Sequence, residues 1–432
     1  MEKIEKLIKE RKAKVGIVGM GYVGLPLAVE FAKGGFAVTG FEVDAQKVRD
    51  LKAGISYISD VSTETVGALA KKGLLTATLD FSALRKMDAV IICVPTPLRK
   101  SKDPDVSYIV ASVQEARKYL RRGQIIILES TTYPGTTKEL VKPMLEAGPL
   151  KAGRDFYLAF SPERVDPGNP KYGVKNTPKV VGGLTPACTR LAGLLYAAVI
   201  DRVLEVTNTE TAELVKLLEN TFRAVNIGMM NEMALMCNKL GLDVWEVINA
   251  AASKPFGFMP FYPGPGIGGH CIPLDPHYLG WKMKTLNFEP RFIELAGAIN
   301  SSMPEHVVAR LGELLNTRGK ALSRSKVLMI GMAYKPDIAD HRESPAHDVL
   351  ILLEKTGAAA DYYDPYVAET DLEGETRRSR KDALKKIKEY DCVMIVTPHS
   401  CIDYADIVKR ARLVFDTRNA TKGLKGKNLY RL

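Results

Sequence analysis

A short apolar strand that runs into a glycine-rich turn is the feature that most constrains the fold of this chain. Residues 14–18 read K-V-G-I-V, and they are followed by G-M-G-Y-V-G at 19–24 and a helical pattern over 25–33. A second strand is expected at 37–41, and it ends in Glu42, about 20 positions after the motif. The glycines let the main chain approach a pyrophosphate at a helix N-terminus, where unpaired N–H groups favour negative charge. The pattern therefore predicts a βαβ unit that binds a dinucleotide.

The acidic residue after the second strand selects the type of dinucleotide. A carboxylate at Glu42 suits a free ribose hydroxyl and would repel a 2′-phosphate, so NAD is favoured over NADP. A glycine turn used only for packing is the alternative. The predicted cofactor-binding residues of this segment are Gly19, Gly21, Tyr22, Val23, Gly24 and Glu42.

Three further strands are expected at 87–94, 124–128 and 157–160, with helices between them. Alternation of this kind predicts a parallel, doubly wound sheet, whose ligands lie beyond the carboxyl ends of the strands. Residues that are polar or break regular structure follow each of these strands, although Ser and Thr at such positions also serve as simple strand caps. The candidates are Pro95 and Thr96, then Glu129, Ser130, Thr131 and Thr132, then Ser161, Glu163 and Arg164.

A long helix is expected from Thr209 to Leu240, because this run contains no proline and a single interior glycine. Its apolar surface covers much of the circumference, which is typical of a helix buried between domains or in a dimer interface. Lys216 and Asn220 lie one turn apart and so share a face. Further helices are expected at 243–252 and 291–315.

The stretch F-Y-P-G-P-G-I-G-G-H-C-I-P-L-D-P at 261–276 reads as a loop that touches a ligand. Its glycines leave the main chain accessible, and Cys271 lies close enough to Asp275 for the carboxylate to influence the thiol proton. A surface loop with a buried free cysteine is equally compatible with these residue types. A metal site made from His270, Cys271, Asp275 and His277 is a weaker alternative, because the spacing matches no standard zinc pattern.

The first pattern recurs near the end of the chain. K-V-L-M-I-G-M-A-Y-K-P at 326–336 parallels the N-terminal strand and turn, with Ala333 and Pro336 in place of two glycines. Lys335 and Arg342 suit a different phosphorylated ligand there, unless the second domain is purely structural. The predicted fold class is α/β, with two Rossmann-like doubly wound domains joined by a long central helix and a small helical domain. The expected domains are an NAD-binding domain at 1–205, a central helical domain at 206–315 and a second ligand-binding domain at 316–432.

Composition narrows the class of protein further. The net charge of +11 invites a nucleic-acid hypothesis, but the densest basic run, 377–388, has no aromatic residue for base stacking and is expected to be a solvated helix face. No apolar run reaches the length of a membrane span, and the start of the chain is a charged amphipathic helix. Six scattered cysteines favour reduced thiols. We expect a cytoplasmic protein that binds neither nucleic acid nor membrane and forms a homodimer or a higher homo-oligomer.

Seven motifs in order resemble the nucleotide-sugar 6-dehydrogenase family over nearly the whole chain. They are G-M-G-Y-V-G, E-S-T-T-Y-P-G-T, S-P-E-R-V-x-P-G, A-E-L-V-K-L-L-E-N-T-F-R, P-G-P-G-I-G-G-H-C-I-P-L-D-P, G-M-A-Y-K-P-D-I-x-D-H-R-E-S-P and F-D-T-R-N. The segment K-P-F-G-F-M-P-F-Y-P-G-P-G-I-G-G-H-C-I-P is most similar to the branch that acts on UDP-N-acetylglucosamine. The branches for UDP-N-acetylmannosamine and UDP-glucose remain alternatives.

The resemblance implies oxidation of the C6 alcohol of a UDP-sugar to a carboxylate, with two NAD reduced. Cys271 would be the nucleophile that forms a thiohemiacetal and then a thioester. Lys216 and Asn220 would stabilise the developing oxyanion. Asp275 and Glu163 would serve water activation and thioester hydrolysis, and Thr131 would hold a catalytic water.

The resemblance also implies binding residues. Pro95, Thr96, Thr131 and Arg342 would lie near the cofactor. Those near the substrate would be Glu163, Arg164, Lys216, Asn220, Tyr262, Gly264, Gly266, Gly268, Lys335 and Arg418.

The chain departs from the UDP-glucose branch in two places. Asp166-Pro167-Gly168 stands where that branch has a second glutamate, and an arginine donated by a neighbouring subunit has no clear counterpart near Lys254. A two-electron hydroxyacid dehydrogenase and a non-catalytic module that binds NAD and a nucleotide sugar are the competing functions.

Overall fold

The computed structural model describes residues 1–58, 60–99, 103–166, 169, 171–269 and 271–432. Two compact units are present. The first comprises residues 1–219 and 277–287, and the second comprises residues 220–276 and 288–432. The three-domain division expected from the sequence remains a prediction.

The first unit is built on one eight-stranded sheet with the order β3-β2-β1-β4-β5-β6-β7-β8. The six strands from β3 to β6 are parallel, and β7 runs antiparallel to β6. This 3-2-1-4-5-6 order is that of dinucleotide-binding domains, so the predicted doubly wound sheet is confirmed. The strands are β1 (Lys14–Val18), β2 (Ala37–Phe41), β3 (Leu75–Thr78), β4 (Ala89–Ile92), β5 (Ile125–Leu128), β6 (Tyr157–Phe160), β7 (Lys179–Gly183) and β8 (Val203–Val206).

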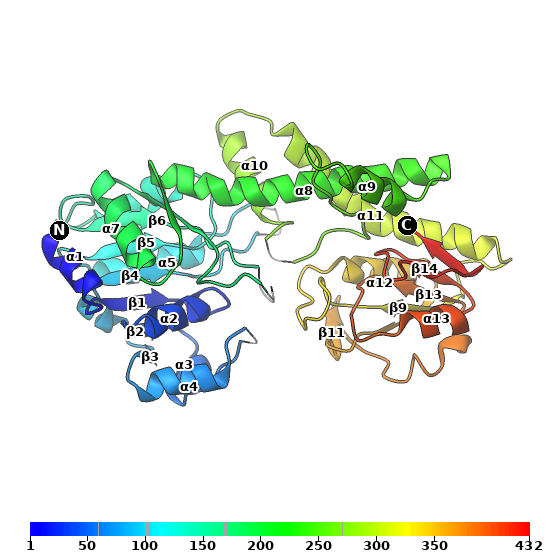
Figure 1. Ribbon diagram of the computed structural model, residues 1–432, viewed down its shortest axis with the longest axis horizontal. Coiled ribbons are helices and arrows are strands. Elements are labelled where there is room, and N and C mark those ends of the chain that lie inside the picture. The colour runs from blue at the N-terminus through cyan, green and yellow to red at the C-terminus, as the bar shows by residue number, and fades with distance from the viewer. Residues whose placement is uncertain (59, 100–102, 167–168, 170, 270) are drawn as a thin grey trace. The chain divides into compact units, whose positions relative to one another are not determined.

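Helices cover both faces of this sheet (Figure 1). Leu25, Phe31 and Tyr196 belong to the apolar cluster on one face, and Ile109, Leu145 and Ala212 belong to that on the other. Alternating strand residues supply the middle of each cluster, as expected for a sheet buried on both sides. The helical segments are α1 (Glu2–Lys9), α2 (Gly24–Lys33), α3 (Ala45–Lys52), α4 (Thr63–Lys71), η1 (Phe81–Lys86), α5 (Ser107–Lys118), η2 (Thr136–Val141), α6 (Lys142–Leu145) and α7 (Pro186–Ala197).

The glycine turn between β1 and α2 depends on close backbone contacts. Gly19 has a φ of +90°, which favours glycine, and its N–H donates to the Phe41 carbonyl at 2.8 Å. A Cβ on Gly24 would collide with the Gly19 carbonyl oxygen, whereas one on Gly21 would meet no atom within 4 Å. The first and third glycines are therefore required by packing, and the second leaves open space beside the main chain.

The second unit contains a five-stranded parallel sheet with the order β10-β9-β13-β14-β15. Its helices also lie on both faces, because Met303 and Val349 pack on one side and Ile387 and Ile407 on the other. The elements are α9 (Val244–Ala252), α11 (Arg291–Asn316), β9 (Lys326–Ile330), α12 (Pro345–Lys355), β10 (Ala359–Tyr363), β11 (Glu369–Leu372), β12 (Glu375–Arg378), η3 (Ile387–Glu389), β13 (Cys392–Ile395), α13 (Tyr404–Arg410), β14 (Val414–Asp416) and β15 (Leu429–Arg431).

The predicted repeat of the first pattern is visible in the geometry of the second turn. Gly331 follows β9 with a φ of +91°, and its N–H donates to the Tyr363 carbonyl at 2.9 Å, as Gly19 does to Phe41. Asp364 occupies the place that Glu42 has in the first unit, because its Oδ2 accepts the N–H of Met332 at 2.7 Å. Both units thus brace their first turn with a carboxylate from the end of the neighbouring strand.

The expected long helix is present as α8 (Thr209–Leu240), which Figure 1 shows as the longest helix, and α10 (Asp275–Thr285) follows the glycine loop. Several of the apolar side chains of α8 remain exposed in the single chain. Leu218 is 63% exposed and Leu240 is 71% exposed. No helix among the described residues is both long enough and apolar enough to cross a membrane.

One prediction about the basic run is wrong. Residues 377–388 form the end of β12 and a series of turns, and the run contains only the first residues of the short segment η3. Two arginines of the run form ion pairs with other segments, since Arg377 contacts Glu354 at 3.2 Å and Arg380 contacts Asp361 at 3.2 Å. Arg377 and Arg378 pair with β11, and the lysines that follow lie in turns and in η3. The strand expected at 87–94 is also shorter, since β4 begins two residues later and ends two residues earlier.

The glycine turn yields a test of the packing in the first unit. We expect Gly24→Ala to lower the free energy of unfolding by about 1–3 kcal/mol, because the added methyl group forces α2 away from the Gly19 carbonyl. Gly21→Ala is the matched control and should leave the thermal unfolding midpoint within about 2 °C of the original. Equal midpoints for the two variants would contradict this account of the turn.

Candidate active site

The turn after β1 has the features required to hold a dinucleotide. The space beside Gly21 is open, Val23 lies directly before the first turn of α2, and the Tyr22 side chain is 55% exposed. The N-terminus of α2 carries a partial positive charge at this point, although the Leu25 N–H already donates to the Gly21 carbonyl at 3.1 Å. The residues present therefore fit a bound pyrophosphate.

Glu42 is buried at the end of β2 and contacts the same turn. Its Oε2 accepts the N–H of Met20 at 3.0 Å, and its Oε1 accepts the N–H of Val43 at 2.8 Å. Lys47 Nζ lies 3.7 Å from Oε2. The carboxylate thus has the position of the ribose-binding acidic residue of a Rossmann domain. Its role in ribose binding remains a prediction.

The predicted residues at the ends of β4 and β5 lie on the same edge of the sheet, because these strands are parallel neighbours. The Ser130 hydroxyl donates to the Val94 carbonyl at 2.7 Å and ties the two strand ends together. Thr131 is half-buried, and the Thr96 carbonyl accepts a hydrogen bond from the Tyr278 hydroxyl at 2.6 Å. Pro95 is exposed beside them.

A cluster of buried charges lies where β5, β6 and β7 meet. Lys179 forms ion pairs with Glu129 and with Glu163, and the second of these has a length of 3.2 Å. Burial raises the pKa of Glu163. Burial together with the nearby Lys216 ammonium lowers the pKa of Lys179 to about 7. Sequence reasoning named Glu129 and Glu163 but missed Lys179. The available signal was the presence of a charged residue at the start of the apolar strand K-V-V-G-G.

Lys216 has the anionic neighbour that its position requires. The side chain is only 8% exposed on α8, and its positive charge lowers the pKa of Glu163 against the effect of burial. Arg164 points its guanidinium at Glu219, with Nη2 2.5 Å from Oε1, and at the Pro178 carbonyl. Lys216, Glu163 and Arg164 thus belong to one part of the first unit.

In the second unit, the structure brings Asn220 and Asp275 together. Asn220 Nδ2 donates to Asp275 Oδ2 at 2.5 Å, and both side chains are buried. The Asp275 N–H donates to the Cys271 carbonyl at 2.8 Å at the start of α10. Cys271 itself is exposed, so the alternative of a buried free cysteine does not describe this loop.

The glycines of the loop are required by close packing within the second unit. A Cβ on Gly264 would collide with the Arg418 guanidinium, and one on Gly268 would lie 2.8 Å from Tyr334 Cβ. Gly266 has a φ of +130°, and its carbonyl accepts a hydrogen bond from Arg418 Nη2 at 3.4 Å. Two predicted substrate residues, Gly264 and Arg418, are therefore in direct contact.

A buried amide pair that sequence reasoning missed anchors this loop. Asn231 on α8 is fully buried, and its Oδ1 accepts the Gly264 N–H at 2.9 Å. Its Nδ2 donates to Asn300 Oδ1 on α11 at 2.8 Å. Tyr262 stacks on Trp245 with a centroid separation of 5.6 Å. Because asparagines are common on helix surfaces, no local signal distinguished Asn231 and Asn300.

The turn after β9 differs chemically from the first turn. Hydrogen bonds from His399 and from the N–H groups of Ala333 and Met332 outweigh the effect of burial and lower the pKa of Asp364 to about 2. Lys335 is half-buried beside this turn. Arg342 is exposed and pairs with Asp340 at 2.6 Å. The cofactor role predicted for Arg342 and the substrate role predicted for Lys335 remain predictions.

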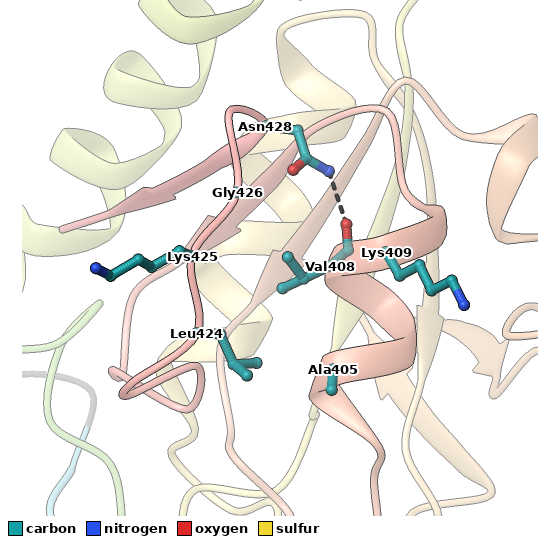
Figure 2. Close-up of a pocket in the computed structure, with 7 residues that line it drawn as sticks. All are labelled: Ala405, Val408, Lys409, Leu424, Lys425, Gly426 and Asn428. Carbon is teal, nitrogen blue, oxygen red and sulfur yellow. Dashed lines mark hydrogen bonds between the residues drawn. The ribbon is translucent and has the colours of Figure 1, made fainter.

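A hollow of about 410 Å³ lies elsewhere in the second unit, between α13 and the segment 424–428 (Figure 2). Asn428 Nδ2 donates to the Val408 carbonyl at 2.9 Å across one end of it. The predicted site residues of this unit lie on other segments. The hollow is therefore separate from the candidate site.

The metal alternative for the glycine loop has no support in the described part of the chain. His270 lies outside the described residues. Among the residues that are described, no group of three or more His, Cys, Asp and Glu side chains could hold a metal ion.

The sheet order and the glycine turn of the first unit are those of the NAD-dependent dehydrogenases. Residues 13–200 match the NAD binding domain of the UDP-glucose/GDP-mannose dehydrogenase family, residues 210–302 match its central domain and residues 328–423 match its UDP binding domain. The chain therefore belongs to this family, and its cofactor is NAD.

Individual relatives agree with this membership. The chain is 36% identical over 360 residues to UDP-N-acetyl-D-glucosamine 6-dehydrogenase of Pseudomonas aeruginosa. This alignment covers 83% of this chain and 84% of the relative. The chain is 32% identical over 416 residues to UDP-N-acetyl-D-mannosamine dehydrogenase of Pyrococcus horikoshii, covering 95% and 96%. A solved structure of UDP-D-ManNAc dehydrogenase from Pyrococcus horikoshii superposes with a TM-score of 0.87 at 31% identity, covering 97% and 98%.

The amide pair that anchors the glycine loop yields a second test. We expect Asn231→Ala to lower the free energy of unfolding by about 1–3 kcal/mol, because it leaves the buried Gly264 N–H and the Asn300 amide without their partner. Asn226→Ala on the same helix is the control, since Asn226 Nδ2 donates to the Phe222 carbonyl within its own helix. The free energy of unfolding of that variant, measured by chemical denaturation, should differ from that of the original protein by less than about 0.5 kcal/mol. A result in which both variants unfold alike would rule out a special role for Asn231.

Proposed function

We propose that this protein oxidises the C6 hydroxyl of UDP-N-acetyl-D-glucosamine to a carboxylate, giving UDP-N-acetyl-D-glucosaminuronate. The observation that carries the proposal is the exposed Cys271 thiol next to the buried Asn220–Asp275 pair, in a chain that belongs to a nucleotide-sugar dehydrogenase family. A four-electron oxidation needs a group that retains the aldehyde between two oxidations, and a thiol can do so by covalent addition. A two-electron hydroxyacid dehydrogenase would have no use for this cysteine.

Each side chain has a defined task in this proposal. The turn at Gly19, Gly21 and Gly24 would hold NAD, which would supply the hydride acceptor for both oxidations. The Cys271 sulfur adds to C6 at the aldehyde stage and passes its proton to a nearby base. Lys216 and Asn220 stabilise the negative charge that develops on the C6 oxygen, for which an ammonium and an amide are suited.

The final step releases the product from the enzyme. Water adds to the thioester carbon, the C–S bond breaks and Cys271 leaves as a thiolate, while a carboxylate takes the proton from the attacking water. Glu163 and Asp275 are the proposed carboxylates, and Thr131 holds the water. Burial raises the pKa of Glu163, which brings it closer to the range of an effective base at neutral pH.

The remaining predicted residues are proposed to bind the two ligands. Pro95, Thr96 and Arg342 would lie near the cofactor, and Arg164, Tyr262, Lys335 and Arg418 near the UDP-sugar. The contact of Arg418 with Gly264 and Gly266 supports its place beside the glycine loop. In this assignment, the segment 1–205 binds NAD, the segment 206–315 contains the glycine loop and the segment 316–432 binds the UDP part of the substrate.

The identity of the sugar rests on the loop sequence and on the relatives. K-P-F-G-F-M-P-F-Y-P-G-P-G-I-G-G-H-C-I-P favours UDP-N-acetylglucosamine, and the 36% identical Pseudomonas aeruginosa protein is named for this substrate. The Pyrococcus horikoshii relative is named for UDP-N-acetyl-D-mannosamine, which makes that sugar the second candidate. UDP-glucose is the third. A cytoplasmic location, where NAD and nucleotide sugars meet, is part of the same proposal.

The proposed reaction predicts a stoichiometry. We expect about two NADH for each UDP-N-acetylglucosamine consumed, measured by absorbance together with chromatography of the product, because the alcohol is carried through to the acid. The value of kcat/KM for UDP-N-acetylglucosamine should exceed those for UDP-N-acetylmannosamine and UDP-glucose by about 10-fold or more. We expect Cys271→Ala to abolish acid formation and to leave NAD binding unchanged.

Cys401→Ala is the matched control, because Cys401 and Cys271 are the two exposed cysteines among the described residues. It should retain full activity. One NADH per sugar would overturn the four-electron reaction, and an active Cys271→Ala enzyme would overturn the assignment of the nucleophile. A protein that binds NAD and UDP-sugars without turnover would be a binding module instead.

We also propose that the chain forms a homodimer through α8. Exposed apolar side chains recur along this helix and would be covered by a second copy, which is what such a patch indicates. They are Leu214, Leu218, Phe222, Met229, Met236 and Leu240.

The dimer is tested by charge substitution on this face. We expect Leu218→Lys to convert the dimer to a monomer in light scattering, because an unpaired ammonium would be buried at the interface. Leu79→Lys is the control, since Leu79 is 50% exposed after β3. A monomeric unsubstituted protein, or a variant that remains dimeric, would contradict this interface.

A further inference from the structure

Lys179 is a buried cation held between two carboxylates in the first unit. It is 4% exposed at the start of β7, which runs antiparallel to β6, so its side chain lies at the carboxyl end of the parallel strands. Its Nζ pairs with Glu129 and lies 3.2 Å from Glu163 Oε2. The Tyr196 ring centroid is 5.4 Å from the same nitrogen. The lysine therefore connects the ends of three strands.

Both oxygens of the Glu163 carboxylate are held. The N–H groups of Arg164 and Val165 each donate to Oε1 at 2.7 Å. Lys179 is the partner of Oε2. The main chain thus fixes one oxygen, and Lys179 contacts the other.

Glu129 holds Lys179 in place from the other side. This carboxylate is 1% exposed, and its Oε2 accepts hydrogen bonds from the Tyr196 hydroxyl at 3.2 Å and from the Cys93 thiol at 3.6 Å. Burial raises the pKa of Tyr196, and it raises that of Cys93 to about 12, so both remain protonated donors at neutral pH. Glu129 thus has two hydrogen-bond donors in addition to its ion pair with the lysine.

The charges around Glu163 come from three directions. Lys179 lies on β7, and Lys216 faces the carboxylate from α8. Arg164 follows Glu163 in the chain, but its guanidinium is directed at Glu219 and the Pro178 carbonyl. Burial lowers the pKa of Lys179 to about 7 and raises that of Glu163. Because Lys179 Nζ lies 3.2 Å from Glu163 Oε2, removal of this cation would favour the neutral form of the carboxyl group.

We propose that Lys179 is a positioning residue for thioester hydrolysis: it orients Glu163 Oε2 toward the attacking water and keeps Glu163 ionised, while Glu129 anchors the lysine. The inference rests on the proposed function, in which Glu163 takes the proton from the water that attacks the Cys271 thioester. The lysine itself forms no bond with the substrate in this scheme. Its effect acts entirely through Glu163.

The variants separate this role from simple stabilisation. Lys179→Met removes the cation but leaves two buried carboxylates, which can prevent folding. The double variant Glu129→Gln with Lys179→Met removes one buried charge of each sign, so it keeps the protein folded while Glu163 still lacks its partner. Lys179→Arg restores the cation. Lys138→Met is the control, because Lys138 is an exposed lysine paired with Glu210 at 2.9 Å.

We expect the double variant to lower kcat about 10- to 100-fold at pH 7, with little change in the KM for NAD. Hydrolysis should become rate-limiting, so a rapid burst of about two NADH per site should precede slow turnover, and mass spectrometry should detect the acylated enzyme. Removal of a positive charge raises the pKa of a carboxylate, so the acidic limb of the pH–kcat profile should move up by about one to two units. Lys179→Arg should recover most of the activity, and Lys138→Met should match the original enzyme.

A double variant that folds and shows no burst and an unmoved acidic limb would overturn the inference. Failure of the proposed function is recognised separately, because then the unsubstituted enzyme forms no NADH with any of the three UDP-sugars. In that event, the Glu163 carboxyl can be titrated by NMR of ¹³C-labelled glutamate, with Glu163→Gln to assign the signal. Its midpoint should be higher in the double variant than in the original protein, and an equal midpoint would overturn the inference without any activity assay.

Discussion

The close approach of Gly24 to the Gly19 carbonyl is the contact on which the first unit depends. It allows α2 to begin directly over the end of β1, so that the positively polarised N-terminus of the helix lies at the edge where β4, β5 and β6 also end. Parallel strands bring distant segments of the chain to one edge, and the glycine turn adds the positive helix terminus there. The predicted cofactor residues of the first unit therefore share one edge of the sheet although they come from separate parts of the sequence.

The second unit repeats this turn with different chemistry. Gly331 keeps the left-handed turn, but Ala333 and Pro336 replace the later glycines, so a helix no longer begins over the strand end. Asp364 accepts hydrogen bonds from four main-chain N–H groups and from His399, which lower its pKa. This segment lies in the part of the chain that matches a UDP binding domain, and the role of Lys335 in ligand binding remains a prediction.

The two units use buried polar groups in different ways. In the second unit, neutral amides at Asn231 and Asn300 satisfy the main chain of the glycine loop, and neutral hydrogen bonds of this kind are inexpensive to bury. In the first unit, Lys179, Glu129 and Glu163 are charged, and burying charges costs several kcal/mol per ion before pairing offsets it. A buried charged cluster therefore contributes little to stability by itself. Its position at the strand ends favours a role in proton transfer.

The sequence by itself determined the two Rossmann-like folds, the long helix α8, the family and the residues that carry the proposed chemistry. These features have local signals, namely strand and helix periodicity and glycine turns, or extended motifs such as the one around Cys271. Only the tertiary structure decided that Lys179 pairs with Glu129 and Glu163, that Asn231 anchors Gly264 and that the loop glycines pack against Arg418 and Tyr334. It also showed that the run 377–388 consists of the end of a strand followed by turns and does not form a helix face. The physical reason is that such contacts depend on strand order and helix packing, which bring together residues far apart in a sequence whose local patterns do not record them.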